Sequence, residues 1–221
     1  MAEKEVLIQE LIRDGYLKSP LIIEAFQAID RIDFVPPEFQ GDAYINAPLP
    51  IGFGQTISQP LTVAFMLELL EPQPGEKILD IGAGSGWQTA MLAYIVSSGK
   101  RPETDNKQRE KKGKVFAIER IKELCQFGKQ NVTNYNFLEK GIVEVFCQDG
   151  SLGLKEFAPF DKIIAAATAE KIPADWKEQL RIGGRIVAPV SQSIIMLDRI
   201  GKTKFSQKEF FGFSFVPLIK G

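Results

Sequence analysis

The sequence feature that most constrains the fold is a short apolar segment that leads into three alternating glycines. Residues 77–81 have the character of a buried strand, the glycines begin at Gly82, and residues 87–96 carry apolar side chains at helical spacing. Such a strand–turn–helix unit is typical of sheets whose parallel strands alternate with helices. Ligands bind in these sheets at the carboxyl ends of the strands, so the glycine turn is the first candidate site.

The alternation of strand and helix patterns continues along the chain. Helical spacing of apolar residues is found at 62–70 and again from about residue 121. Further buried strands are predicted at residues 115–118, 142–146 and 162–166. This order predicts an α/β fold with a doubly wound, mostly parallel sheet.

The two ends of the chain depart from this alternation. Residues 3–30 read as two helices, with Ser19 as the cap and Pro20 in the first turn of the second helix. Strand character without intervening helices is found near the C-terminal end, in residues 185–190, 193–199 and 210–218. We therefore expect an N-terminal helical extension and antiparallel C-terminal strands.

The chain contains no histidine. Histidine is the commonest general base and a frequent metal ligand, so its absence excludes Ser-His-Asp and Cys-His catalysis. The two cysteines, Cys125 and Cys147, are far apart in sequence and have no close-spaced partner, so neither a zinc site nor a redox dithiol is predicted. We expect two buried, inert thiols and no bound metal.

Charge and hydropathy restrict the partners. The formal net charge of −1 gives no general attraction to nucleic acid or to an anionic membrane. No apolar run has the length of a membrane span, and the charged N-terminal segment does not resemble a signal peptide. We expect a cytoplasmic monomer that binds neither nucleic acid nor membranes.

The glycine turn itself narrows the choice of ligand. A dinucleotide-binding loop has glycine at its first, third and sixth positions, but the sixth residue counted from Gly82 is Trp87. The Gly-Lys-Ser/Thr sequence that binds nucleoside triphosphates is also absent. The remaining pattern, Asp80 followed by Gly82, Gly84 and Gly86, resembles the nucleotide loop of S-adenosylmethionine-dependent methyltransferases.

Two later carboxylates follow successive predicted strands. Glu119 comes directly after residues 115–118, where a carboxylate can accept hydrogen bonds from both ribose hydroxyls of a nucleoside. Asp149 and Gly150 follow residues 142–146, where an aspartate can accept a hydrogen bond from an adenine amino group. Either carboxylate alone is more often a solvated loop residue, but the two together favour S-adenosylmethionine as the cofactor.

The chain as a whole resembles the protein-L-isoaspartate (D-aspartate) O-methyltransferases, which are protein repair carboxyl methyltransferases. The most specific part of the resemblance is Gly-Gln-Thr-Ile-Ser at residues 54–58. Other matching segments, in order, are residues 34–36, 48–60, 79–88, 119–120, 149–150, 158–161, 183–185 with 189–190, and 215–218. The resemblance implies methyl transfer from S-adenosylmethionine to the α-carboxylate of L-isoaspartyl residues in damaged proteins and peptides, which initiates repair through a succinimide.

The resemblance also implies roles for individual residues. It makes Ser58 the catalytic serine and adds Gln55, Thr56 and Val216 as substrate-binding residues. The implied cofactor-binding set consists of Thr56, Ile57, Ser58, Asp80, Gly82, Gly84, Gly86, Glu119, Asp149 and Gly150. A second interpretation of Ser58 is that it caps the helix that is predicted to begin near residue 61.

The implied substrate explains how the chain can work without histidine. A carboxylate has a pKa of about 4, so it is already anionic at neutral pH and needs no general base. The task is to bring one carboxylate oxygen in line with the methyl group at about 3 Å. Uncharged donors can hold the other oxygen without neutralising the nucleophile.

We expect one methyltransferase domain over residues 1–221. Its predicted parts are the N-terminal helices with the active-site loop at 1–60, a cofactor-binding core at 61–190 and C-terminal strands at 191–221. A hydrophilic insertion at 97–114 is interpreted as a solvated surface loop, with a docking patch for an acidic partner as the alternative. Two other functions stay open at this point: a related carboxyl or small-molecule methyltransferase, and a catalytically silent cofactor-binding module.

Overall fold

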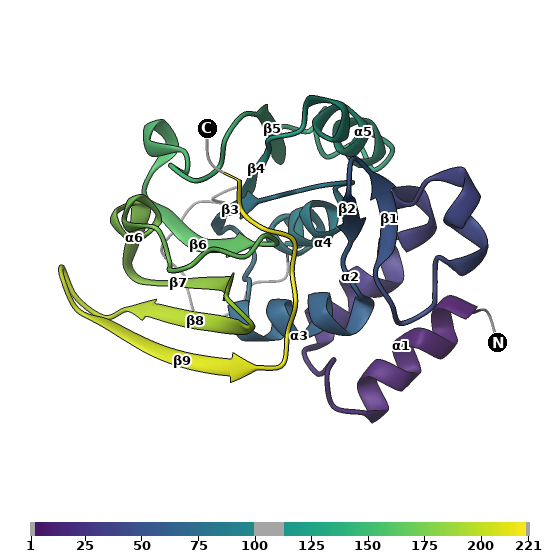
Figure 1. Cartoon of the computed structure of the whole chain (residues 1–221), viewed down its shortest axis with the longest axis horizontal. Coiled ribbons are helices and arrows are strands. Elements are labelled where there is room, and N and C mark those ends of the chain that lie inside the picture. Colours follow the sequence, from purple (N-terminus) through teal and green to yellow (C-terminus); the bar gives the residue numbers. More distant parts are fainter. Residues whose placement is uncertain (1–2, 100–112, 220–221) are drawn as a thin grey trace.

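The computed structural model describes residues 3–99 and 113–219, so most of the predicted insertion lies outside the described residues. Its centre is a seven-stranded sheet with the order β5-β4-β3-β6-β7-β8-β9 (Figure 1). The strands are β3 (Lys77–Ile81), β4 (Lys114–Glu119), β5 (Val143–Cys147), β6 (Phe160–Ala165), β7 (Leu180–Val190), β8 (Ser193–Arg199) and β9 (Phe205–Phe211). Strands β3 to β7 pair in parallel, and β8 and β9 are antiparallel to their neighbours. The predicted α/β class, a doubly wound, mostly parallel sheet with antiparallel C-terminal strands, is confirmed.

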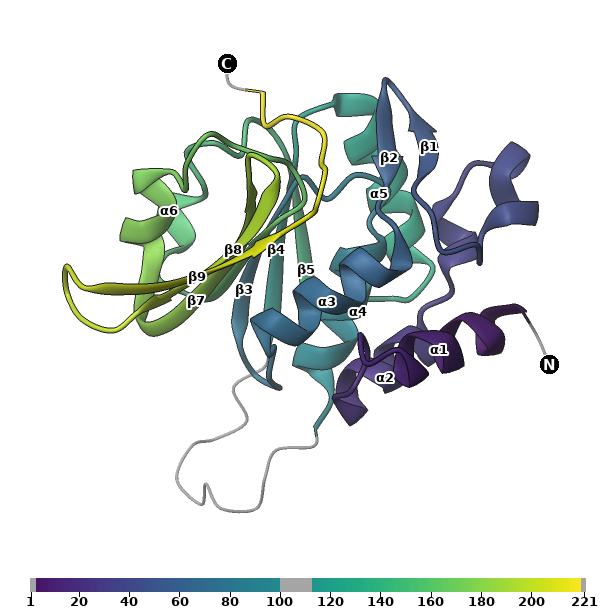
Figure 2. The ribbon, with the colours of Figure 1, turned by 60° about the horizontal axis from the view of Figure 1, so that its bottom comes forward.

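Helices cover both faces of this sheet, as Figure 2 shows. One face carries α3 (Pro60–Leu70), α4 (Trp87–Ser97) and α5 (Lys122–Thr133), and the other carries the short α6 (Ala174–Gln179). Alternate residues of a strand point to opposite faces, so Ile78 joins the first core while Leu79 and Ile81 join the second. Burial on both faces explains why β3 reads as a continuous apolar run.

The N-terminal extension consists of two helices that pack on the α3–α4 face. They are α1 (Glu3–Arg13) and α2 (Pro20–Ala28), and both were expected from the helical spacing. Pro20 occupies the first turn of α2, but the Ser19 side chain does not cap the helix. Its Oγ donates instead to Glu68 Oε2 of α3 at 2.7 Å, because α3 lies close enough to offer a charged acceptor.

Between α2 and α3 the chain forms two 3-10 helices and a small hairpin. The 3-10 helices span Arg31–Phe34 and Pro37–Asp42, and the hairpin pairs β1 (Leu49–Gly52) with β2 (Gln55–Ile57). The hairpin stands beside the carboxyl end of the sheet in both views (Figures 1 and 2). It therefore places residues 55–58 next to the glycine turn.

The prediction of a last strand at residues 210–218 is wrong. The edge strand β9 ends at Phe211, and Gly212 with a φ of +97° turns the chain out of the sheet. The following segment runs back across the carboxyl ends of the central strands, where an isolated bridge joins Thr168 and Pro217. It is visible in Figure 1 as the yellow strand-free trace that leads to the C-terminal end.

Candidate active site

A hollow lies at the carboxyl ends of β3, β4 and β6. Its floor includes Gly82 and Gly84 of the turn after β3, and Glu119 at the end of β4 lines it as well. Its walls come from the segment of residues 55–58 and from residues 216–219. The fold thus brings three distant parts of the chain to the place where doubly wound sheets bind ligands.

The glycine turn is held under the hollow by backbone hydrogen bonds. The N–H groups of Gly82 and Ala83 donate to the carbonyl oxygen of Ile118 at 2.9 and 3.0 Å. Gly82 and Gly84 have φ angles of +78° and +54°, a region that favours glycine. A Cβ atom on Gly84 would stand 3.2 Å from Ile51 Cδ1 of the hairpin, so a side chain there would crowd the hollow.

Gly86, the third glycine of the turn, lies against α5. It lies outside the lining of this hollow and is the N-cap of α4, with a φ of +92°. A Cβ atom there would lie 2.9 Å from the Gly128 carbonyl oxygen and 2.9 Å from Val132 Cγ2. The third glycine of the turn therefore allows α5 to approach the start of α4.

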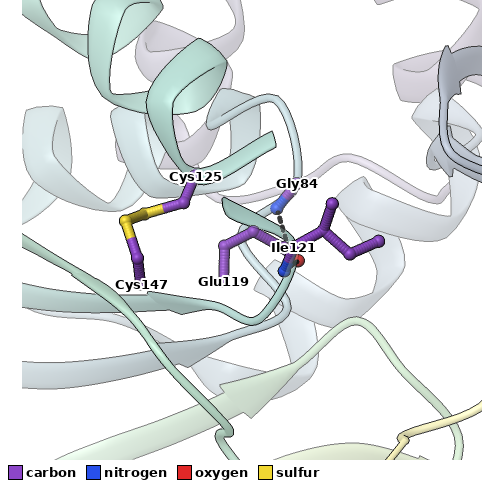
Figure 3. Close-up of a disulfide and its surroundings, with 5 residues drawn as sticks. All are labelled: Gly84, Glu119, Ile121, Cys125 and Cys147. Atoms are coloured by element: carbon purple, nitrogen blue, oxygen red, sulfur yellow. Dashed lines mark hydrogen bonds between the residues drawn. A yellow bond between two sulfur atoms is a disulfide. The ribbon is translucent and has the colours of Figure 1, made fainter. Parts of the chain in front are cut away.

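Glu119 fastens the glycine turn to the end of β4. Its carboxylate is only 7 % exposed, Oε2 accepts from the Gly84 N–H at 2.9 Å, and Oε1 accepts from the Ile121 N–H at 2.9 Å (Figure 3). A carboxylate oxygen can accept further hydrogen bonds, so both remain able to accept from hydroxyl groups in the hollow.

A disulfide joins Cys125 of α5 to Cys147 at the end of β5, which corrects the expectation of two inert thiols (Figure 3). The two Cα atoms are 5.6 Å apart, although the residues are separated by 22 positions in sequence. Cys147 is also paired with Glu119 across β4 and β5. The disulfide therefore lies next to Glu119, whose carboxylate holds the glycine turn.

Asp80 lies inside the protein, outside the lining of the hollow. Its Oδ1 accepts from Gln88 Nε2 at 2.8 Å and its Oδ2 accepts from Thr89 Oγ1 at 2.6 Å. Burial raises the pKa of Asp80 to about 6, against the lowering effect of the two hydrogen bonds. In this arrangement Asp80 fastens the first turn of α4 to β3.

Asp149 and Gly150 are placed differently from each other. Gly150 lines the hollow, and its carbonyl accepts a hydrogen bond from Trp176 Nε1 at 2.9 Å. The Asp149 carboxylate accepts from the backbone N–H and the hydroxyl of Ser151 at 2.8 and 2.9 Å, and Asp149 is not among the lining residues. An adenine acceptor role would use the remaining lone pairs of this carboxylate.

The segment from Gln55 to Ser58 lines the hollow, with Ile57 buried, Thr56 exposed and Ser58 partly exposed. The helix cap proposed for Ser58 is not seen. The N-cap position of α3 is Gln59, and the free N–H of Leu61 is satisfied by Asn46 Oδ1 at 3.0 Å. Within residues 3–99 and 113–219, no side-chain hydrogen bond involves the Ser58 hydroxyl, which leaves it available to a ligand.

A second, more open hollow continues outward from the first. Thr56, Ser58, Ala166 and Val216 line both, and the outer hollow is completed by residues 211–215 and the start of α3. Val216 is fixed in place because its carbonyl accepts from the Thr168 N–H at 2.8 Å. The junction of an inner and an outer hollow is the place where two ligands could meet.

Sequence reasoning missed Arg31, which lies directly behind this junction. It is 1 % exposed, and its Nη2 donates to the carbonyl oxygen of Ser58 at 3.2 Å. Burial lowers the pKa of Arg31 to about 10, so it still carries its charge at neutral pH. In the sequence it looks like any surface arginine, since its neighbours Asp30 and Asp33 would suit a solvated turn.

Neither a cluster of metal-binding side chains nor a membrane-spanning helix is found among the described residues. Among the described residues no set of three or more histidine, cysteine, aspartate or glutamate side chains is arranged as a metal site. In the same part of the chain, no helix combines the length and apolar character that crossing a membrane requires.

Known proteins are similar to this chain over nearly its whole length. The sequence profile of the family described as protein-L-isoaspartate(D-aspartate) O-methyltransferase matches residues 2–221. A protein-L-isoaspartate O-methyltransferase of Aeropyrum pernix is 42% identical over 217 residues, which are 96% of this chain and 78% of the relative. One of Staphylothermus marinus is 40% identical over 221 residues, which are 98% of this chain and 94% of the relative.

Solved structures show the same fold. A chain from Plasmodium falciparum, described as a protein-L-isoaspartate O-methyltransferase in complex with S-adenosyl-L-homocysteine, superimposes with a TM-score of 0.84, 23% identity and 98% coverage of both chains. A second chain described as a protein-L-isoaspartate O-methyltransferase superimposes with a TM-score of 0.81 and 25% identity. This superposition covers 99% of the present chain and 66% of the solved one.

Proposed function

This chain belongs to the protein-L-isoaspartate(D-aspartate) O-methyltransferase family, and we propose that Ser58 is the point at which its two ligands meet. The enzyme transfers a methyl group from S-adenosylmethionine to the α-carboxylate of L-isoaspartyl residues in damaged proteins. The single observation that carries the proposal is that Thr56, Ser58, Ala166 and Val216 line both the inner and the outer hollow. A methyl group passing between two ligands must cross this junction.

The inner hollow fits the cofactor. The glycine turn leaves space that a side chain on Gly84 would restrict, and the buried Glu119 carboxylate can accept from ribose hydroxyls. The sulfonium of S-adenosylmethionine supplies an activated methyl group. The other proposed cofactor contacts are Thr56, Ile57, Gly82 and Gly150, while Asp80 and Gly86 support the turn from outside the lining.

The outer hollow suits the isoaspartyl peptide. The free hydroxyl of Ser58 can donate to one oxygen of the substrate carboxylate, and the exposed Thr56 can donate beside it. Gln55 and Val216 are proposed to contact the adjoining peptide. Because these donors are uncharged, the second carboxylate oxygen keeps its nucleophilic character for in-line attack at about 3 Å.

Methylation of matched peptides tests this placement. Wild-type protein should methylate a peptide with L-isoaspartate and leave its L-aspartate counterpart unmodified. Ser58→Ala should lower kcat by roughly 10²-fold while the Kd for S-adenosylhomocysteine changes less than about twofold, because the lost donor acts on the carboxylate. Ser206→Ala, an exposed serine on β9, is the matched control and should retain wild-type kcat. Unchanged turnover in Ser58→Ala would refute the role of this hydroxyl.

We also propose that the enzyme acts as a monomer without nucleic acid. The formal net charge of −1 gives no general attraction to nucleic acid, which supports the second part of this proposal. Light scattering of the active protein, with and without a peptide substrate, tests the monomer. A cytoplasmic location stays a prediction, and the disulfide makes it worth testing by cell fractionation, because disulfides are rare in the cytosol outside hyperthermophiles.

A further inference from the structure

Arg31 is a buried cation that has no acidic partner in the described part of the chain. Its side chain belongs to the 3-10 helix Arg31–Phe34 and is 1 % exposed. Within residues 3–99 and 113–219 it forms no ion pair, and burial is the one influence on its pKa. Buried arginines are almost always paired with a carboxylate, since an unpaired buried charge costs several kcal/mol. Such an arrangement calls for a compensating role.

The guanidinium donates to three backbone carbonyl groups. Nη1 donates to the Ala43 carbonyl oxygen at 2.6 Å, and Nη2 donates to those of Ala47 and Ser58 at 3.0 and 3.2 Å. Nε has no hydrogen-bond partner among the residues that the structure describes. Arg31 therefore ties the loop of residues 43–47 to the backbone of the active-site serine.

The guanidinium of Arg31 also lies over the aromatic ring of Trp87. The Arg31 Cζ atom lies 5.3 Å from the centroid of the Trp87 ring, and Trp87 lines the inner hollow. Trp87 in turn packs edge-on against Phe26 of α2, with ring centroids 5.5 Å apart. The charge thus lies between the serine loop and the start of α4, with contacts to both.

The side chains around Ser58 leave this charge uncompensated. Among the described residues, none that lines the outer hollow is charged, and the charged residues of the inner lining are Glu119 and Arg120 at the end of β4. In a region of low dielectric, a cation held at a fixed distance attracts an anion without touching it. Arg31 therefore adds a positive potential at the Ser58 end of the site, where the described residues of the outer lining are uncharged.

We propose that Arg31 is a positioning residue whose fixed positive charge selects a carboxylate at Ser58. This inference rests on the placement of the substrate carboxylate proposed above. The anionic substrate gains from the charge, whereas the neutral methyl ester product does not, so the same residue favours substrate over product. Its hydrogen bond to the Ser58 carbonyl also fixes the backbone that carries the catalytic hydroxyl.

Three variants separate the charge from the hydrogen bonds. Arg31→Gln is neutral but still donates to carbonyl groups, Arg31→Met is a second neutral variant, and Arg31→Lys keeps the charge but cannot hold three carbonyl groups. Each is titrated with an L-isoaspartyl peptide and with the same peptide carrying an α-carboxamide in place of the α-carboxylate, at saturating S-adenosylhomocysteine. The readout is the ratio of the two dissociation constants, which a purely structural role would leave unchanged.

We expect the wild type to prefer the carboxylate peptide by about tenfold or more, and the neutral variants to lose about tenfold of that preference. Arg31→Lys should keep the preference within about threefold while kcat falls by about tenfold, because the Ser58 backbone is less firmly held. A neutral variant that binds S-adenosylhomocysteine and keeps the full preference would overturn the inference. If neither neutral variant binds S-adenosylhomocysteine, the test rests on Arg31→Lys. Loss of the preference for the carboxylate peptide in Arg31→Lys would also overturn the inference. A wild type without any preference would instead contradict the placement of the carboxylate at Ser58.

Discussion

The Glu119 carboxylate accepts a hydrogen bond from the backbone N–H of Gly84 at 2.9 Å, so the end of β4 and the turn after β3 form one unit. The same carboxylate holds the Ile121 N–H at the entrance to α5. Because both its oxygens face backbone donors and one side of it lines the inner hollow, this group is already oriented before a ligand arrives. A ribose would meet a fixed acceptor.

The first prediction concerns this acceptor. Glu119→Gln should weaken S-adenosylhomocysteine binding by about tenfold to a hundredfold, since hydrogen bonds to a charged group contribute about 1.5–3 kcal/mol. Calorimetric titration measures the Kd. Glu123→Gln, which removes the same charge from an exposed position on α5, is the matched control. A wild-type Kd in Glu119→Gln would exclude the ribose role.

The second prediction concerns the disulfide between Cys125 and Cys147. Closing a loop with a sequence separation of 22 residues restricts the unfolded chain and should add about 3 kcal/mol to the free energy of unfolding. Cys147→Ser is the cleaner variant, because Cys147 is exposed while Cys125 is buried. Urea unfolding of the variant and of the reduced wild type should give the same loss. A loss below about 1 kcal/mol in both would show that the cross-link does not contribute in this way.

The strands could be predicted because both faces of the sheet are buried. A strand such as β3 then shows a continuous apolar run, and the glycines after it announce a turn that side chains would block. Part of the lining of the inner hollow could also be predicted, because the carboxyl ends of parallel strands lie at the same edge of the sheet. Glu119 could therefore be assigned to that edge from its position directly after a strand.

What the sequence did not reveal depends on contacts between distant segments. The disulfide exists because α5 lies over β5, a packing that the spacing of Cys125 and Cys147 does not encode. The C-terminal segment reads as a strand because it is apolar, yet it is apolar because it lines a hollow. Arg31 gives no local signal at all, since its partners are carbonyl groups that any residue could supply.

The third prediction concerns the close approach of α5 to the glycine turn. Gly86→Ala should lower the free energy of unfolding by about 3 kcal/mol, because the new methyl group meets the Gly128 carbonyl oxygen at 2.9 Å in addition to the backbone strain. Gly212 is a matched control, since its φ of +97° is close to the +92° of Gly86 and its Cβ would meet nothing within 4 Å. Gly212→Ala should therefore cost only about 1 kcal/mol. Equal losses in the two variants would contradict the steric argument.

The fourth prediction concerns the buried carboxyl group of Asp80. Burial raises its pKa from 3.8 to about 6; hydrogen bonds from Thr89 and Gln88 act in the opposite direction, and the charge of Glu119 adds a smaller increase. The folded protein therefore holds this proton more tightly than the unfolded chain does. Stability from this group is greatest below about pH 4 and falls as the pH rises toward 6, above which the full penalty of about 3 kcal/mol applies.

Asp80→Asn removes this titration while keeping a side chain of similar size. The difference in unfolding free energy between the variant and the wild type should therefore shift by about 2.5 kcal/mol in favour of the variant between pH 4 and pH 7. Urea unfolding at several pH values measures this difference, which cancels the titration of the other groups. Asp42→Asn, at an exposed carboxyl group, should show a difference that does not change in this way. A flat difference for Asp80→Asn would mean that Asp80 is stabilised as a carboxylate in the folded protein, through its bonds to Gln88 and Thr89.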